Sequence, residues 1–348
     1  YVGVVLKYNT KLKHTKDKIL ISEKLNQSES KINISFIGAG SYAQGNLLPN
    51  IPRSKEIQKI GVLTNSGTTS KLVAEKFNFQ FCTSSEKDIF NDKTNTIFIA
   101  TRHDSHASYV LKALHCHKHV FVEKPLCLNE SELDEIILAQ QKVKTSLMVG
   151  YNRRFSPLSK KIKNKIGFGP ISMIYRINAG SISSDHWIQD LKTGGGRIIG
   201  EVCHFIDYLT FLNGSLPRTV SAQAMADPKS LNDTVNILLQ FENGSTGVIC
   251  YYANGSKSLN KEYLELFCSG KTIILKDFKA LEIYENGKRN KTKLLNQNKG
   301  QKEMLLSFTS GIIKDGKAPI KFDEIVSVTK TCFKVLESIK HSGQLIYI

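Results

Sequence analysis

Short apolar runs alternate with amphipathic stretches over residues 31–149. The runs are rich in Ile, Val and Phe, as is typical of buried strands in a parallel sheet. They predict strands at Ile32–Ile37, Ile57–Leu63, Thr96–Ala100, His119–Val122 and Ser146–Val149. Apolar positions at helical spacing between them predict helices at Ala43–Asn50, Ser70–Phe77, His106–His115 and Glu130–Val143. This order predicts a doubly wound α/β domain of the Rossmann type over residues 31–149.

The pattern changes after Gly150, where strands follow one another through tight turns. Asn243-Gly244 separates the predicted strands Thr234–Phe241 and Thr246–Tyr252, which is typical of a hairpin. Further strands are predicted at Ile171–Ala179, Thr219–Ala224, Tyr263–Cys268, Thr272–Leu275 and Leu281–Tyr284, with helices near Val202–Leu212 and Phe322–Lys340. We therefore expect residues 150–348 to form a second α/β domain with an open, mostly antiparallel sheet.

The first 30 residues do not fit either pattern. A strand-like piece, Val2–Leu6, precedes a polar, lysine-rich segment that is typical of a linker. The chain has 348 residues, of which 41% are hydrophobic, so it suits two domains. Because the first residue is Tyr, we expect the natural chain to start further upstream.

Composition excludes several classes of protein. The chain has no apolar run of about 18 residues and no signal peptide, so we expect no membrane span and a cytoplasmic protein. The seven cysteines are scattered, without a Cys-x-x-Cys pair, and we expect free thiols. The net charge of +17 reflects either a Lys- and Asn-rich composition or attraction of an anionic substrate or cofactor. The lysines are dispersed, so no nucleic acid partner is expected, and His115-Cys116-His117 is not expected to bind a metal.

A glycine-rich turn follows the first predicted strand. It has the pattern Gly-x-Gly-x-x-Ala and leads into a helix, which is typical of a loop that binds the pyrophosphate of a dinucleotide. The first glycine permits the turn, the second lets the backbone approach the phosphates, and the helix start donates N–H groups. The expected cofactor contacts here are Gly38, Gly40, Ser41, Tyr42 and Ala43.

The end of the second strand normally distinguishes NAD from NADP. A carboxylate there would hold the ribose 2′-hydroxyl of NAD. The segment has none, and its candidate cofactor contacts are Thr64, Asn65, Ser66 and Lys71. The choice between NAD and NADP stays open, and the missing carboxylate slightly favours NADP.

Two later segments bring polar side chains to the carboxyl edge of the predicted sheet, where ligands of open α/β sheets bind. Thr101, Arg102, His103 and His106 follow the strand that ends at Ala100. The triplet Glu123-Lys124-Pro125 follows the next strand. All are candidate cofactor contacts, and the Lys124–Pro125 bond is a candidate cis peptide.

These motifs, together with Gly150-Tyr151-Asn152-Arg153-Arg154-Phe155, resemble the glucose-fructose oxidoreductase, inositol dehydrogenase and MocA (Gfo/Idh/MocA) family. The resemblance runs from about Lys31 to the C-terminus. It implies a Rossmann domain followed by an α/β domain with an open, mostly antiparallel sheet. It also implies that Lys124 contacts both the nicotinamide ribose and the reacting substrate oxygen, and that Asn152 lies at the cofactor.

A second family signature, Asp-x-Gly-x-His, corresponds to the segment from Gly194 to Asp207. The resemblance implies that His204 accepts or donates the proton of the reaction. The position of the family aspartate holds Gly200, and Glu201, one residue along, is a candidate replacement. This version resembles a bacterial subgroup in which the module follows a zinc-type alcohol dehydrogenase module, and residues 1–8 would then be the tail of that upstream module.

The predicted function is an NAD(P)-dependent oxidoreductase that acts on a sugar-like hydroxyl or carbonyl, with a nucleotide-linked or polysaccharide-related sugar as one candidate substrate. Its candidate catalytic residues are Lys124, His204 and Glu201, and its candidate substrate contacts are Lys124, Tyr151, Arg153, Arg154, His186, Trp187 and His204. For the arginines the alternative is a salt bridge between domains, and for His186 and Trp187 it is packing. The second hypothesis is a module that senses a dinucleotide without catalysing a reaction. The resemblance also implies a homo-oligomer.

Overall fold

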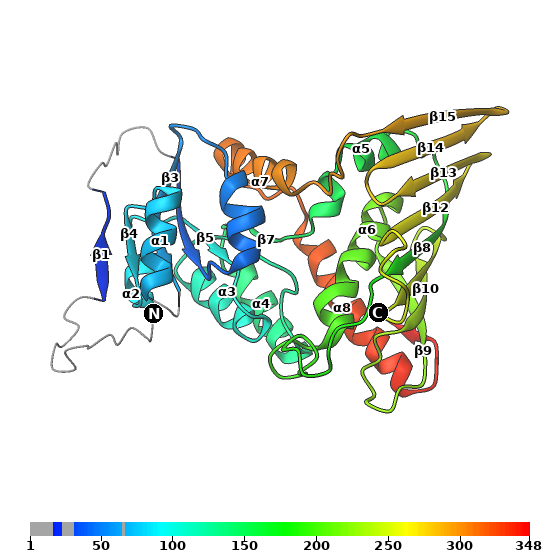
Figure 1. Cartoon of the computed structure of the whole chain (residues 1–348), viewed down its shortest axis with the longest axis horizontal. Coiled ribbons are helices and arrows are strands. Elements are labelled where there is room, and N and C mark those ends of the chain that lie inside the picture. Colours follow the sequence, from blue (N-terminus) through cyan, green and yellow to red (C-terminus); the bar gives the residue numbers. More distant parts are fainter. Residues whose placement is uncertain (1–16, 23–30, 65–66) are drawn as a thin grey trace, which may run out of the picture.

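The computed structural model describes residues 17–22, 31–64 and 67–348. The predicted strand Val2–Leu6 and the candidate residues Asn65 and Ser66 lie outside the described residues. The described residues form a seven-stranded and a nine-stranded sheet, each with helices packed against it (Figure 1). Among the described residues, no helix has the length and apolar character needed to cross a bilayer.

The seven-stranded sheet has the order β1-β4-β3-β2-β5-β6-β7 and confirms the Rossmann prediction. Its strands are β1 (Lys18–Leu20), β2 (Ile32–Ile37), β3 (Ile57–Leu63), β4 (Phe81–Thr83), β5 (Thr96–Ile99), β6 (His119–Val122) and β7 (Leu147–Val149). The helices are η1 (Ala43–Leu47), η2 (Leu48–Asn50), α1 (Gly67–Phe77), α2 (Glu86–Ile89), η3 (His103–Ser105), α3 (His106–His115) and α4 (Glu130–Gln141). Strand order reverses between β2 and β5, and the crevice at such a switch point is the usual ligand site.

The expected linker over residues 1–30 needs a correction. Residues Lys18–Leu20 form β1, which pairs antiparallel with β4 at the sheet edge. Neither strand was predicted, because three-residue strands are too short to show a period of two.

The nine-stranded sheet has the order β15-β14-β13-β12-β8-β11-β10-β9-β16. Its strands are β8 (Ser172–Asn178), β9 (Pro217–Ala224), β10 (Val235–Phe241), β11 (Thr246–Tyr252), β12 (Glu262–Cys268), β13 (Lys271–Lys276), β14 (Ala280–Glu285), β15 (Lys288–Lys293) and β16 (Ile346–Tyr347). Within the described chain, β8 and β11 form the only parallel pair of this sheet, so the prediction of a mostly antiparallel sheet is confirmed.

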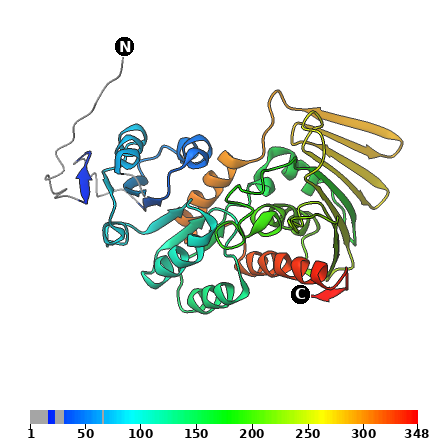
Figure 2. The ribbon, with the colours of Figure 1, turned by 60° about the horizontal axis from the view of Figure 1, so that its bottom comes forward.

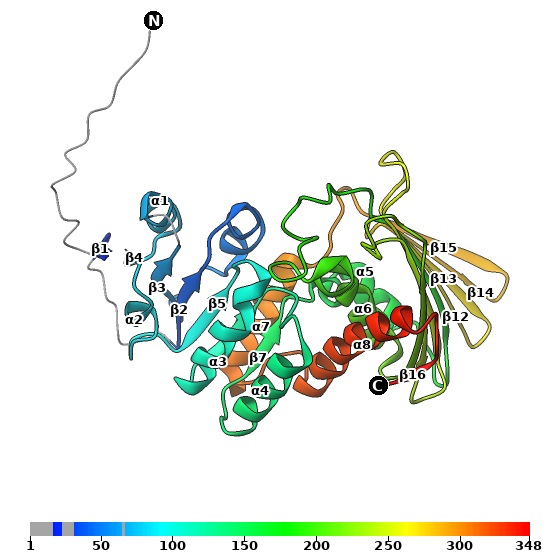
Figure 3. The ribbon, with the colours of Figure 1, turned by 90° about the horizontal axis from the view of Figure 1, so that it is seen from below.

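Helices cover one face of this second sheet. They are η4 (Asn152–Phe155), α5 (Pro157–Lys163), η5 (Ile198–Val202), α6 (Cys203–Asn213) and α8 (Phe322–Lys340), and α8 (red) runs against the sheet in Figures 2 and 3. In β10 the alternate residues Val235, Ile237 and Leu239 are buried, whereas Leu238 on the opposite face is half exposed. The strand alternation therefore reflects one covered and one open face.

Helix α7 (Gln301–Asp315) does not follow the expected division at residue 150. It contacts η4 of the second domain as well as β2, η1 and η2 of the first, and it lies beside the first sheet in Figure 1. The Phe308 ring packs at 5.7 Å from Phe98 and 5.6 Å from Phe121, measured between centroids. The chain thus returns to the Rossmann sheet, and α7 packs on both domains.

Candidate active site

The glycine-rich turn between β2 and η1 has two glycines with different roles. Gly38 has φ +80°, and a Cβ on it would lie 2.6 Å from the carbonyl oxygen of Ala100, so a side chain is excluded by the protein itself. A Cβ on Gly40 would meet nothing within 4 Å. The turn therefore leaves open space over Gly40, as a backbone that cradles phosphates requires. Ser41 and Tyr42 are exposed at the helix start, and Ala43 is buried against the sheet.

The end of β3 carries hydroxyls but no carboxylate. Ser70 Oγ lies 3.2 Å from the Thr64 backbone nitrogen, which donates to it, and 2.8 Å from Thr64 Oγ1. Lys71 is exposed, with Nζ 3.9 Å from the carboxylate of Glu75. This arrangement lacks the negative charge that would repel a 2′-phosphate.

The two histidines after β5 differ in their surroundings. His106 is fully buried, and its ring nitrogens lie 2.7 Å from the Pro125 carbonyl oxygen and 3.3 Å from that of Thr101. Burial lowers the pKa of His106 to about 4. His106 therefore ties two backbone segments together and is not itself free to contact a cofactor, which corrects the prediction.

His103 lies where the two domains meet. Its Nδ1 is 2.7 Å from the Gly194 carbonyl oxygen, and its ring packs edge to face on Trp187 with centroids 4.8 Å apart. The Arg102 guanidinium lies over the same indole, 5.6 Å from the ring centroid. Thr101 Oγ1 accepts a hydrogen bond from Ser105 Oγ at 2.6 Å. Trp187 is thus packed against the Rossmann domain, whereas His186 is exposed.

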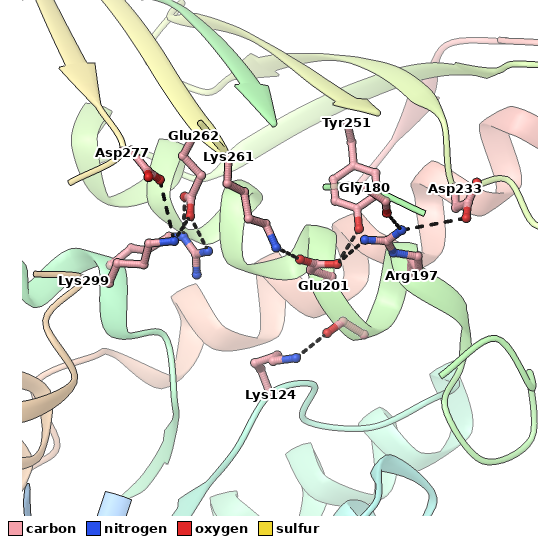
Figure 4. Close-up of polar contacts among 12 residues, drawn as sticks. Lys124, Gly180, Arg197, Glu201, Asp233, Tyr251, Lys261, Glu262, Asp277 and Lys299 are labelled. Carbon is pink, nitrogen blue, oxygen red and sulfur yellow. Dashed lines mark hydrogen bonds and ion pairs between the residues drawn. The ribbon is translucent and has the colours of Figure 1, made fainter. Parts of the chain in front are cut away.

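Lys124 reaches from the first domain to the second. The peptide bond between it and Pro125 is cis, as the sequence suggested. Its Nζ donates a hydrogen bond of 2.7 Å to the Gly200 carbonyl oxygen, at the position of the missing family aspartate (Figure 4). Gly200 lies one helical turn before His204, so the ammonium group and the imidazole share one region.

Glu123 is a buried carboxyl group beside Lys124. Burial raises its pKa to about 7, although the Lys124 charge acts in the opposite direction. Within the described chain its Oε1 has no hydrogen-bond partner. A Cβ on Gly150 would come within 2.8 Å of this oxygen, so the glycine makes room for the carboxyl. A buried oxygen without a partner at this edge could form a hydrogen bond with a polar group of a bound cofactor.

His204 is almost completely buried, at 7% exposure. Its ring meets the Tyr151 ring edge to face, with centroids 6.1 Å apart, and Nδ1 has no partner in the described part of the chain. Burial lowers the pKa of His204 well below its usual value, and the charges of Arg153, Lys124, Lys261 and Lys299 lower it further. The imidazole is therefore neutral at physiological pH and can accept a proton.

Glu201 is held in a network of donors (Figure 4). Its carboxylate accepts from Arg197 at 3.0 Å and also from Tyr251 and Lys261. Burial raises the pKa of Glu201, but the charges of Lys261 and Arg197 outweigh it and bring the pKa to about 2. With three donors already bound, Glu201 is not a free carboxylate in place of the family aspartate, which corrects its candidate role.

Arg153 and Arg154 are committed to internal ion pairs, which corrects their predicted contact with an anionic substrate. Arg153 donates to both oxygens of Glu262, at 2.8 and 2.9 Å. Arg154 donates to Asp207 at 2.8 Å and pairs with Glu324. All five residues lie after residue 150, so the pairs hold the second domain together.

Asn152 also has a structural contact. Its Nδ2 donates to the Lys299 carbonyl oxygen at 2.8 Å, and the residue is buried.

The sequence did not predict two lysines of the site, Lys299 and Lys261, whose charges act on His204. Neither lies in a motif, and only the folding of the loop before β12 and the segment before α7 brings them to His204.

The fold and these motifs are those of a nicotinamide-dependent oxidoreductase, and comparison with known protein families identifies which family it is. Residues 32–151 match the family described as "Oxidoreductase family, NAD-binding Rossmann fold", and residues 169–274 match the "GFO/IDH/MocA C-terminal domain". The chain belongs to the Gfo/Idh/MocA family of oxidoreductases.

Individual relatives support the same assignment. The chain is 30% identical to oxidoreductase YrbE of Bacillus subtilis over 227 residues, covering 63% of this chain and 66% of YrbE. It is 30% identical to oxidoreductase P35 of Formosa agariphila over 228 residues, covering 62% of this chain and 71% of P35. The chain thus spans about two thirds of each relative. A levoglucosan dehydrogenase in complex with NADH and levoglucosan has the same fold, with a TM-score of 0.79, 18% identity and coverage of 91% of this chain and 99% of that structure.

Proposed function

We propose that the protein transfers hydride between a nicotinamide cofactor and a hydroxyl or carbonyl group of a sugar-like substrate. The observation that carries the proposal is the contact of Lys124 Nζ with the Gly200 carbonyl oxygen, one helical turn from the neutral, unpaired imidazole of His204. A cation and a proton acceptor thus stand together at the edge where a cofactor of this family lies.

The chemistry needs few groups. In the oxidative direction the hydroxyl proton of the substrate moves to His204, while the adjacent carbon loses a hydride. The nicotinamide supplies the acceptor for that hydride. The Lys124 ammonium favours negative charge on the reacting oxygen, so it lowers the barrier to forming the alkoxide.

The cations around His204 act on both partners of this proton transfer. Lys261 and Lys299, with Arg153, make the site electropositive and so favour the alkoxide. The same charges oppose protonation of His204. We infer that the proton does not stay on His204 but passes onward to solvent.

The cofactor is NAD or NADP, held by Gly38, Gly40 and the N-terminus of η1. The absence of a carboxylate at the end of β3 and the exposed Lys71 nearby support NADP. Titration with each cofactor tests this preference, and clearly tighter binding of NAD would refute it.

The substrate lies beside Lys124 and His204, with Tyr151, His186 and Trp187 as further contacts. Trp187 supports this placement because it packs on His103 at the junction of the domains. The levoglucosan bound to a dehydrogenase of the same fold supports a sugar-type ligand.

We further propose that the protein is cytoplasmic and forms a homo-oligomer through the open face of the second sheet, where Ile174, Leu238 and Phe267 are each at least 40% exposed. The proposal of an upstream zinc-type alcohol dehydrogenase module rests on the resemblance of residues 194–207 alone.

Nicotinamide fluorescence tests the function directly. The protein is mixed with each oxidised cofactor and a panel of sugars and polyols that includes D-glucose, myo-inositol and levoglucosan. A dehydrogenase reduces the cofactor with at least one of them, so fluorescence of the reduced nicotinamide grows with time. A sensor would bind the cofactor and sugar without any change of redox state, and that result would refute the proposal.

A further inference from the structure

The imidazole of His103 fills the space in front of Gly200. A Cβ built on Gly200 would lie 2.9 Å from Cε1 of His103 and 3.3 Å from its Nδ1. Real Cβ atoms hardly ever approach a ring carbon so closely, so the ring and a side chain at position 200 exclude each other. The first domain thus places a polar ring beside the position at which the second domain lacks a side chain.

The ring is fixed and its tautomer follows from its partner. The Gly194 carbonyl oxygen can only accept a hydrogen bond, so Nδ1 of His103, 2.7 Å away, carries a proton. Burial and the charge of Lys124 lower the pKa of His103 to about 3, so the ring is neutral and Nε2 is unprotonated. The hydrogen bond of the ring to the described part of the chain is the one made by Nδ1, so Nε2 is left for another partner. Nε2 is therefore an available acceptor.

This acceptor belongs to the same site as Lys124 and His204. Lys124 Nζ binds the Gly200 carbonyl oxygen, and the His103 ring touches the Cα side of the same residue. The nearby indole of Trp187 limits movement of the ring. Because Lys124 and His204 are needed at the reacting oxygen, the His103 acceptor is left for a different oxygen of the substrate.

We propose that Nε2 of His103 is a specificity-determining group of this site, which accepts a hydrogen bond from a substrate hydroxyl on the carbon next to the reacting one. The inference rests on the proposed function. A neutral acceptor binds a hydroxyl, which can donate, and repels carboxylate, phosphate and ketone oxygens, which cannot. Sites built to bind a hydroxyl discriminate strongly against analogues that lack it, because the acceptor is then left unpaired.

The test compares the best sugar in the panel with its analogue deoxygenated next to the reacting carbon. For D-glucose that reacts at C1 or C3, the probe is 2-deoxy-D-glucose, because C2 is bonded to both of these carbons. We expect kcat/KM of the wild-type enzyme to fall at least about tenfold on removal of this hydroxyl. His103→Asn keeps an N–H donor for Gly194 but has no acceptor at the Nε2 position. It should use the two sugars with nearly equal kcat/KM, whereas exposed His115→Asn should discriminate like the wild type.

Gly200→Ala gives an independent variant should His103→Asn fail to fold. The new Cβ displaces the ring, so this variant should also lose most of the discrimination. Equal use of both sugars by the wild type, or undiminished discrimination in His103→Asn or Gly200→Ala, would overturn the inference while leaving the proposed function intact. If no sugar in the panel reduces the cofactor, the proposed function fails instead, and the inference fails with it.

Discussion

Glu262 shows how single buried charges organise the second domain. Its side chain is almost fully buried and accepts from Arg153 and from Lys299, the latter at 2.7 Å, with Tyr175 as a further donor. Burial opposes its ionisation, but the charge and hydrogen bonds of Arg153 dominate and hold the pKa of Glu262 well below its usual value. Arg153 lies two residues after Tyr151, so the pair also anchors the segment that carries Tyr151.

Glu262→Gln should lower the free energy of unfolding at neutral pH by about 3–5 kcal/mol, because it leaves buried cations without their carboxylate. A depressed pKa contributes stability above the unfolded value of about 4.3 that is lost as the pH falls toward the folded value. The difference between wild type and variant should therefore shrink below about pH 4, as measured by urea unfolding across pH. Glu265→Gln, half-buried on the same strand, is the control. A constant difference at every pH would contradict this account.

The sequence located Lys124 and His204 but not the partners of the charged residues around them. The motifs are local, so they could be found by spacing. Arg153 is separated from Glu262 by 109 residues, and His103 from Gly194 by 91. No pattern along the chain encodes such pairs, so the sequence left the arginines between a ligand contact and a salt bridge, and it did not reveal the exclusion between His103 and Gly200.

At the scale of elements, the two glycines of the β2–η1 turn have different roles. Gly38 is needed for folding, and Gly40 leaves space for the cofactor. Gly38→Ala should destabilise the protein by about 1–3 kcal/mol, because positive φ and contact with Ala100 both oppose a side chain. Gly40→Ala should leave thermal stability nearly unchanged, since its Cβ meets no protein atom, and should weaken cofactor binding at least tenfold, roughly 1.4 kcal/mol. Thermal unfolding and cofactor titration measure the two effects. Unchanged cofactor affinity in Gly40→Ala would show that the phosphates lie elsewhere.

Buried elements could be predicted and exposed ones could not. Strands such as β2 and β3 are buried over their last four residues, most of which are apolar, and their predicted bounds agree with the structure. β15 has the sequence KRNKTK and is largely exposed at the sheet edge, so it has neither an apolar run nor alternation. The predicted helix Ala43–Asn50 is divided into the π-helical η1 and the 3-10 helical η2, a change of winding that apolar spacing does not reveal.

On the scale of the whole molecule, α7 joins the two domains. Its Phe308 is fully buried between α7 and the aromatic rings of β5 and β6. Phe308→Ala should cost about 3–5 kcal/mol of stability through loss of buried apolar contact. Leu306→Ala, half exposed on the same helix, should cost far less. Chemical denaturation checks both variants, and a small loss in Phe308→Ala would mean that α7 is only loosely attached to the first sheet.

The two domains meet at Lys124, and replacing it tests the central claim most directly. With the sugar that reduces the cofactor fastest, kcat of Lys124→Ala should fall about 10²–10³-fold, because one charge that stabilises the alkoxide is removed. Cofactor-loaded protein should remain folded, and exposed Lys142→Ala should keep wild-type turnover. A Lys124→Ala enzyme that reduces the nicotinamide at the wild-type rate would contradict the assignment of the chemistry to Lys124 and His204.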